Sequence, residues 1–481
     1  MPFAQTFSRT LSACRLFAGA LALSLLSSCS TPTGSQKESD KWTTSTLGLC
    51  EDYPEETRSL AHAYEDLELA ERSGAKGLRI AFGWDAIEPE RGQYDWAFWD
   101  EFVHTAVKKY HIRLIPYVCY TPKWAAKDQG ENFWRSPPRD AEDFARFMAA
   151  IVHRYRDDIS SWELWNEPDN PAYWLGTHEE FADLVRAGSL AVRESDPRAT
   201  IVLGGLAGET DFLEQLFAID KIAPAVDVVN IHSYFETWHP DPIESLPSYV
   251  ERAASIVKTY GENEPLWMAE TGYSSVDGRA AVSGIYHAHF EGEHTDEAQA
   301  TALARTFVSC LATKRLPLVA WYRINDLPPG ENVIGDDNNR HLGIRNVAGT
   351  NKPAAQAFAL LAQWFQQPYR VVEVDAHVQT ENNDAPNIRG FALEDGRTIV
   401  AIWFGTKRSN PPDTALIPDT RHATVTLKTP VKGATRLLRA DGTLVSSERI
   451  SSKRKLSRRE VSVSITGGEL IYCEISGTRS R

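Results

Sequence analysis

The chain has 481 residues, of which 42% are hydrophobic and 24% are charged, a balance typical of folded globular proteins rather than disordered ones. This length is sufficient for one large domain and a smaller module. The formal net charge of −14 argues against a nucleic-acid partner, because such a protein needs a basic surface.

The first 28 residues have the composition of a secretory signal. Arg9 and Arg15 precede an apolar run over residues 16–26, which is too short to span about 30 Å of hydrocarbon at 1.5 Å per residue. The string Leu26-Ser27-Ser28-Cys29 resembles a bacterial lipobox. This resemblance implies that Cys29 is lipidated, becomes the mature N-terminus and anchors the protein to a membrane of a bacterial cell envelope.

Residues 30–40 are polar and predict a flexible tether, so we assign 1–28 to a lipoprotein signal and 29–43 to the lipidated cysteine and tether. Ser30, rather than an aspartate, follows the cysteine, which in enterobacterial lipoproteins favours the outer membrane. The alternative is an ordinary signal peptide and a secreted protein. Removal of residues 1–28 would remove two arginines and no acidic residue, which makes the net charge −16.

The four other cysteines downstream of Cys29 are widely spaced and lie in apolar stretches. They are Cys50, Cys119, Cys310 and Cys473. This placement predicts buried free thiols rather than a disulfide framework.

From residue 44 the chain alternates short apolar runs with longer amphipathic ones. The predicted strands are 45–50, 77–84, 113–120, 161–167, 200–207, 228–235, 266–273 and 318–326. They are nearly continuous apolar runs, as parallel strands covered on both faces are. The predicted helices include 56–73, 141–156, 178–194, 243–260, 296–313 and 353–367.

Eight strands alternating with helices predict an α/β protein with a (β/α)₈ barrel over residues 44–368. A doubly wound open sheet is the alternative, but it lacks the Gly-rich fingerprint after the first strand. Beyond residue 368, the segments 369–378, 388–394, 398–405, 423–429, 434–440 and 460–475 alternate in two-residue steps. Together with turn signals between them, they predict a β-sandwich accessory domain over 369–481 with a structural role; sugar binding is the alternative.

Two predicted strands end in glutamates, and functional residues of such barrels lie at the strands' C-terminal ends. The fourth strand ends in Glu167 and the seventh in Glu270. Strand alternation predicts that Glu163, Trp165 and Glu167 point to one side, and Leu164 and Asn166 to the other. Carboxylates at the mouth of apolar strands are costly unless they are paired or used.

Two facing carboxylates fit the cleavage of a glycosidic bond, which needs one protonated group and one ionised group. Burial against aromatic rings such as Trp165 would raise the pKa of one carboxyl, and hydrogen-bond donors or a cation would keep the other charged. The simpler alternative is that each glutamate forms an ion pair at the barrel mouth.

The string Trp165-Asn166-Glu167-Pro168 resembles the strand-four signature of the clan A glycoside hydrolases, a group of retaining (β/α)₈ enzymes. This resemblance implies that Glu167 is the acid/base, that Asn166 binds the sugar 2-hydroxyl, and that Glu270 is the nucleophile. It covers residues 44–368. The pattern is similar to family 39, with family 5 as the second choice.

Further positions match the same group. Arg79 in the second strand corresponds to an arginine beside the nucleophile, and His232 and Tyr234 end the sixth strand on one face. Trp321 in the eighth strand matches the tryptophan that floors the sugar subsite. Trp124 and Trp174 lie in loops on the catalytic rim and are predicted sugar platforms, with ordinary packing as the alternative.

The resulting hypothesis is a glycosidase that cleaves β-linked oligo- or polysaccharides by double displacement, without a cofactor or metal. Two clusters, at 287–294 and 336–339, contain potential ligands but lack the spacing of a zinc or calcium site. The alternatives are a non-catalytic glycan-binding lipoprotein and a transglycosylase.

Overall fold

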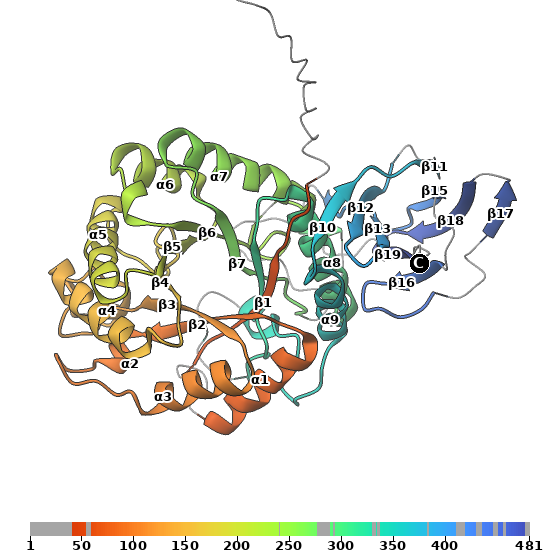
Figure 1. The fold of residues 1–481 in the computed structure, drawn as a ribbon. Helices are drawn as coiled ribbons and strands as arrows, with labels where there is room; N and C mark the ends of the chain where they lie inside the picture. Colours follow the sequence, from red (N-terminus) through yellow and green to blue (C-terminus); the bar gives the residue numbers. More distant parts are fainter. Residues whose placement is uncertain are drawn as a thin grey trace, which may run out of the picture.

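The structure is a computed structural model that describes residues 41–53, 59–239, 241–276, 289–291, 294–329, 333, 337–381, 384–409, 419–429, 435–445, 451–455 and 458–476. Its larger part is a closed barrel of eight parallel strands surrounded by helices (Figure 1). The predicted (β/α)₈ barrel is therefore confirmed.

Each barrel strand lies within or next to a predicted one. In order around the barrel the strands are β1 (Thr46–Glu51), β2 (Gly77–Gly83), β3 (Arg113–Cys119), β4 (Ser161–Asn166), β5 (Thr200–Leu206), β6 (Val228–Ser233), β7 (Leu266–Thr271) and β9 (Leu318–Tyr322). All their residues are buried except at a few strand starts, because helices cover the outside and side chains fill the inside.

The helices follow the strands in the expected alternation. The α-helices are α1 (Leu60–Ser73), α2 (Trp84–Ile87), α3 (Ala97–His104), α4 (Ala141–Tyr155), α5 (His178–Ser195), α6 (Thr210–Glu214), α7 (Leu246–Tyr260), α8 (Asp296–Thr313) and α9 (Pro353–Phe365). Helices α3 and α6 continue as π-helical turns, η2 (Thr105–Lys109) and η4 (Gln215–Ile219), and short 3₁₀ turns lie at η3 (Phe133–Arg135), η5 (Ala223–Ala225), η6 (Ile243–Ser245) and η7 (Asp337–His341).

Local signals set several helix starts. At α5, the side chain of Thr177 accepts from the backbone N–H of Glu180, and the side chain of Glu180 accepts from the backbone N–H of Thr177, which forms a capping box. Asp140 caps α4 and Thr295 caps α8 by accepting backbone N–H groups.

After α9 the chain forms two antiparallel sheets beside the barrel (Figure 1). The five-stranded sheet contains β10 (Tyr369–Val372), β12 (Asn387–Leu393), β13 (Arg397–Trp403), β19 (Leu470–Ser476) and β16 (Thr435–Arg439). The four-stranded sheet contains β11 (Ala376–Thr380), β15 (His422–Thr429), β18 (Arg458–Thr466) and β17 (Ser451–Lys455). The predicted C-terminal β-sandwich is confirmed.

The five-stranded sheet packs against the barrel with one face and against the second sheet with the other. Along β13, Ile399, Ala401 and Trp403 belong to the core shared with the barrel, whereas Val400 and Ile402 belong to the core between the sheets. This two-residue alternation is the property from which the sandwich was predicted. It also shows that Trp403 is buried at the domain interface.

A buried ionic network reinforces this interface. Arg305 of α8 donates to Glu236, in the loop after β6, and to Glu244 of η6 at distances of 2.7–3.1 Å. Glu244 also accepts from Trp403 Nε1 of the accessory domain at 2.7 Å. Beside it, β14 (Lys407–Ser409) of the accessory domain pairs with β8 (His289–Glu291), which belongs to the connection after β7. The accessory domain is thus bonded to segments that follow β6 and β7.

We expect Arg305→Ala to destabilise the protein by about 3–5 kcal/mol, because it leaves two buried carboxylates without their cation. Thermal unfolding followed by circular dichroism measures this effect. Arg315→Ala is the matched control, since Arg315 forms a similar two-point pair with Glu251 on the exposed surface and should lose less than about 1 kcal/mol. Equal melting temperatures for the two variants would contradict the assigned role of Arg305.

Cys50, Cys119, Cys310 and Cys473 are buried and free, as predicted. Within the described ranges, the structure contains no helix that is both long and apolar enough to cross a membrane. The predicted signal, Cys29 and residues 30–40 lie outside the described residues.

Candidate active site

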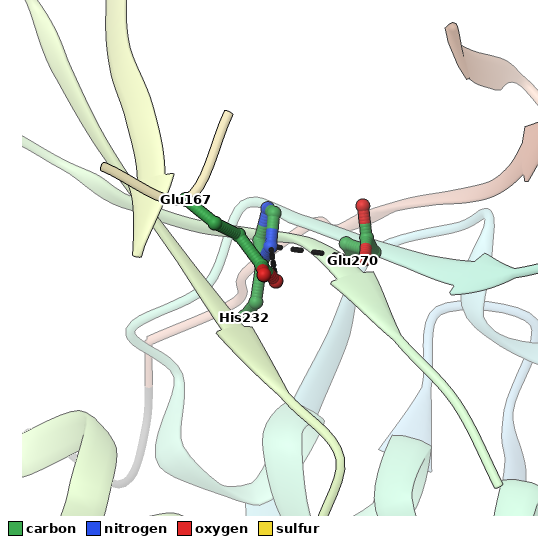
Figure 2. A group of neighbouring side chains, drawn as sticks. All are labelled: Glu167, His232 and Glu270. Carbon is green, nitrogen blue, oxygen red and sulfur yellow. Dashed lines mark hydrogen bonds and ion pairs between the residues drawn. The ribbon is translucent and has the colours of Figure 1, made fainter. Parts of the chain in front are cut away.

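Glu167 and Glu270 meet at the C-terminal mouth of the barrel, with His232 between them (Figure 2). Glu270 lies in β7, His232 is its register partner in β6, and Glu167 directly follows β4. His232 Nδ1 is 3.0 Å from Glu167 Oε1 and 3.8 Å from Glu270 Oε1. One oxygen of each glutamate and one ring nitrogen of His232 all lie within 4.8 Å of one another.

The end of β4 departs from regular strand geometry. Trp165 has φ 81° and Glu167 has φ 44°, both in the left-handed region that non-glycine residues seldom adopt. The prediction that strand alternation extends to Glu167 is therefore wrong. Glu163 and Asn166 both contact Arg79 inside the barrel, whereas the Trp165 ring packs outside.

Packing and hydrogen bonds hold this strained backbone in place. The Trp165 ring centroid lies 4.9 Å from that of Trp174, and Glu167 N donates to Gly205 O of the neighbouring strand at 2.8 Å. A Cβ atom on Gly205 would lie 1.9 Å from His232 Nε2. A glycine at this position in β5 is therefore needed for His232 to occupy the space beside Glu167.

Arg79 links the two strands that carry the glutamates. Its Nη1 donates to Glu270 Oε2 at 2.5 Å, and its Nη2 donates to Asn166 Oδ1 at 2.8 Å. Its Nε and Nη2 also donate to the two oxygens of Glu163 at 2.8 and 2.9 Å. The predicted contact with Glu270 is present, but the sequence did not suggest that Glu163 would share the same cation.

Tyr234 and His232 both reach the carboxylates, as their spacing on one strand face predicted. The Tyr234 hydroxyl donates to Glu270 Oε1 at 2.5 Å. Glu270 thus has a cation on one oxygen and a hydroxyl on the other. By contrast, Glu167 receives hydrogen bonds from neutral side chains, since its other oxygen accepts from Asn170 Nδ2 at 2.9 Å.

These environments separate the protonation states of the two glutamates. Burial raises the pKa of Glu167 to about 7, although Asn170 and Arg79 oppose the increase. Burial also raises the pKa of Glu270, but His232, Arg79 and Tyr234 all oppose it. Burial lowers the pKa of His232 to about 4, so its ring is neutral at pH 7. Glu270, with a cation on one oxygen and a hydroxyl donor on the other, is thus better stabilised as a carboxylate than Glu167, which has neutral partners.

The predictions for two tryptophans are wrong. Trp321 is fully buried and lies in the core between β9 and the helices, where it packs against Phe307 of α8. Trp174 is 3% exposed, and its ring is enclosed by Trp165 and Phe181. Neither ring can form a sugar platform without rearrangement of the core.

Trp124 is half-buried in the loop after β3, where its Nε1 donates to Glu88 O at 2.9 Å and its ring packs edge-on against Trp84. These contacts join two loops and do not bring Trp124 to the glutamates. Its predicted contact with a sugar stays a prediction.

The sequence did not single out several residues of the barrel mouth. The Tyr322 ring packs near Tyr234, and Asp52 after β1 accepts from the hydroxyls of Tyr117 and Tyr322 at 2.6 and 3.0 Å. Half-buried Trp238 lies with its ring centroid 4.7 Å from that of Tyr234. Tyr322 could have been found from its position directly after Trp321. Neighbouring residues in a strand face opposite sides, so if Trp321 faces the helices, Tyr322 faces the barrel interior.

A carboxylate oxygen of Glu167, one of Glu270 and a ring nitrogen of His232 lie close enough together to bind a metal ion. However, Arg79 already supplies the positive charge that neutralises Glu270. The two clusters of potential metal ligands considered from the sequence, 287–294 and 336–339, both lie partly outside the described residues. Within them, His294 is buried against Tyr273, and its Nδ1 lies 2.9 Å from Ser274 O.

A family profile matches the first part of the barrel. The profile of the β-galactosidase family Glyco_hydro_42 matches residues 52–162, which include β2 and β3 and end at the start of β4. The match therefore contains Arg79 and stops short of both glutamates.

Similar proteins of known name are glycoside hydrolases. Mannan endo-1,4-β-mannosidase 8 of Oryza sativa subsp. japonica is 26% identical, over 37% of this chain and 59% of the rice protein. The match thus spans less than two thirds of that relative.

Solved structures match almost the whole chain. A family 39 glycoside hydrolase from Bacteroides cellulosilyticus WH2 is 18% identical with a TM-score of 0.65, over 90% of this chain and 81% of that one. A monomeric β-xylosidase from Caulobacter crescentus CB15 is 17% identical with a TM-score of 0.62, over 91% of this chain and 97% of that one. At these identities the likeness establishes the fold, which is the fold that the resemblance to clan A glycoside hydrolases implied.

Proposed function

We propose that the protein is a retaining glycoside hydrolase that cleaves β-linked oligo- or polysaccharides, with Glu270 as nucleophile and Glu167 as acid/base. The observation that carries the proposal is the distance between the glutamates, whose nearest oxygens are within 4.8 Å. Retaining enzymes place their carboxyl groups about 5–5.5 Å apart, whereas inverting enzymes need about 6.5–9.5 Å to admit a water molecule.

The two environments support distinct roles in a double displacement. Glu270, held by Arg79 and Tyr234, attacks the anomeric carbon while protonated Glu167 donates its proton to the leaving oxygen. The C–O bond to the leaving group breaks, and an ester to Glu270 forms. Glu167, now ionised, takes a proton from water, whose oxygen attacks the anomeric carbon and releases Glu270.

Stereochemistry tests this proposal directly. Proton NMR of the first product formed from an aryl β-glycoside should show the β-anomer before mutarotation, and a first-formed α-anomer would contradict a retaining mechanism. A screen of aryl β-xylosides, mannosides, galactosides and glucosides, together with plant and microbial polysaccharides, selects the substrate. The compared proteins include a β-xylosidase and a β-mannosidase, which makes these sugars the first choice.

The presence of both glutamates disfavours a binding protein built on an inactive barrel. Transfer of the sugar to another hydroxyl would use the same covalent intermediate. Adding an alcohol acceptor and analysing the products separates hydrolysis from transglycosylation.

We further propose that Cys29 carries a lipid that anchors the enzyme in the bacterial cell envelope, where polymeric glycans are encountered. Cys29→Ala should move the protein from the membrane fraction to a soluble one and abolish labelling with radioactive palmitate. Membrane association and labelling equal to those of the unmodified sequence would contradict lipidation at this residue.

A further inference from the structure

Asn230 is a buried side chain that connects three strands of the barrel. It lies in β6, two residues before His232, and its side chain is fully buried. The backbone N–H of Ala269 in β7 donates to Asn230 Oδ1 at 2.8 Å. Asn230 Nδ2 lies 3.0 Å from Glu163 Oε1 of β4 and 3.3 Å from His232 Nε2.

These contacts fix which way the amide of Asn230 faces. In the opposite orientation, the amide nitrogen would face the N–H of Ala269, and the amide oxygen would face the Glu163 carboxylate. Both contacts would be repulsive, since the first pairs two donors and the second pairs two acceptors. The amide nitrogen therefore points towards Glu163 and His232 and offers one hydrogen to each.

The amide in turn fixes the proton on His232. Because an N–H of Asn230 faces His232 Nε2, that nitrogen presents its lone pair. The ring is neutral at pH 7, since burial lowers its pKa to about 4, and so its single proton is on Nδ1. Nδ1 is the atom that lies 3.0 Å from Glu167 Oε1, and it donates this proton in a hydrogen bond.

We propose that Asn230 is a positioning residue that selects the Nδ1–H tautomer of His232 and thereby gives Glu167 a hydrogen-bond donor. The proposal rests on the function proposed above for Glu167. The hydrogen bond is strongest when Glu167 is ionised, which is the state that deprotonates water in the second step. In the other tautomer, a lone pair would face the Glu167 carboxylate and favour its protonated form.

The charges around this chain of hydrogen bonds come from the neighbouring strands. Arg79 of β2, Glu163 of β4 and Glu270 of β7 act on His232, while Asp169 and Tyr234 are further titratable neighbours of Glu167. Asn230→Ala removes none of these groups, but it takes one hydrogen bond from Glu163. The pH profile of this variant is therefore interpreted together with a direct measurement of the tautomer of His232.

Asn230→Ala should release His232 to populate both tautomers. We expect kcat for an activated aryl glycoside to fall by roughly 10- to 100-fold, part of the 10²–10⁴-fold that a positioned acid or base contributes. The kcat should fall more than kcat/KM, because with a good leaving group the second step limits turnover. The basic limb of the kcat/KM profile should move to higher pH, since Nδ1 without a proton stabilises protonated Glu167.

The experiment combines these kinetics with long-range ¹H–¹⁵N NMR of the full chain labelled in histidine, with the His232 signals assigned by their loss in His232→Gln. The unmodified protein should show a protonated Nδ1 and an unprotonated Nε2. Val229→Ala is the matched control, because Val229 is a buried neighbour in β6 and its truncation should leave the tautomer and the pH profile unchanged.

A proton on Nε2 in the unmodified protein would overturn the proposal without any variant. So would an Asn230→Ala protein that keeps the original tautomer and pH profile, since Asn230 would then serve packing alone. Failure of the proposed function has a different signature, in which Glu167→Ala retains full activity while the tautomer is still set by Asn230.

Discussion

Glu270→Gln should lower kcat by on the order of 10⁴-fold or more, as the loss of an enzymatic nucleophile does, while the protein stays folded. A neutral amide cannot form the glycosyl ester. The amide nevertheless fits the site, because its oxygen can accept from Arg79 and its nitrogen can donate to the Tyr234 hydroxyl. Arg79 also keeps its two hydrogen bonds to Glu163, so the interior retains a paired charge.

Initial rates on an aryl β-glycoside measure the loss of kcat, and a melting curve shows whether the variant is folded. Glu88→Gln is the matched control, because Glu88 is equally buried near the barrel mouth but accepts from Trp84 Nε1 and Gly92 N in the loop after β2. It should retain activity. A Glu270→Gln protein with the kcat of the unmodified enzyme would rule out Glu270 as nucleophile.

A mechanism-based inhibitor locates the nucleophile independently. A 2-deoxy-2-fluoro glycoside with a good leaving group should form a stable ester in the unmodified enzyme, because the fluorine slows the second step more than it slows formation of the ester. Mass spectrometry of the digested protein should then find the added sugar on the peptide that contains Glu270. A label on any other peptide would contradict the assignment.

Much of the barrel could be predicted because its signals are local. Strands covered on both faces are continuous apolar runs, and helices between them carry an amphipathic pattern. The alternation along β13 likewise reflects a sheet with two buried faces, one on the barrel and one on the second sheet. In each case the spacing at which apolar residues repeat along the chain follows directly from the backbone geometry of the strand or helix.

The face on which a site residue lies was harder to predict. Trp321 matched a family position, but it is the neighbour Tyr322 that faces the barrel interior. At the end of β4, positive φ angles at Trp165 and Glu167 interrupt the alternation of side chains between the two faces of the strand, and the sequence pattern does not predict them. Such local strain depends on tertiary contacts, here on Gly205 O and the rings around Trp165.

Part of the polar network inside the barrel was not predicted from the sequence. Arg79 and Glu163 are far apart in the chain; Arg79 was expected beside Glu270, and no partner was predicted for Glu163. Their pairing, and the contacts of Asn230 with Glu163 and His232, arise because β2, β4 and β6 direct side chains to one point in the closed barrel. The strand-end glutamates were recognisable from the residues themselves, since a buried carboxylate without an evident partner is costly, and the family resemblance added Arg79, His232 and Tyr234.

Glu167→Ala should show a loss of activity that depends on the leaving group. Substrates whose leaving alcohol needs protonation should lose roughly 10²–10⁴-fold in kcat/KM, whereas an aryl glycoside with a strongly acidic phenol should lose far less. The reason is that formation of the ester to Glu270 then no longer needs an acid. Slow hydrolysis of the ester would remain, because Glu167 also activates water.

Rescue by azide and the pH dependence of kcat/KM distinguish the loss of an acid/base from a general loss of folded structure. Added azide should restore turnover of the activated substrate and give the β-glycosyl azide, since this anion attacks the ester without a general base. In the unmodified enzyme, kcat/KM should fall as pH rises through about 7, because Glu167 must be protonated for the first step and burial raises its pKa to about 7. The neighbouring titratable groups remain in the variant, among them Asp169, whose pKa burial also raises to about 7. The decrease in kcat/KM near pH 7 should therefore vanish only if Glu167 is its origin. A limb near pH 7 that persists in Glu167→Ala, or a lack of rescue by azide, would assign the acid/base role to another group.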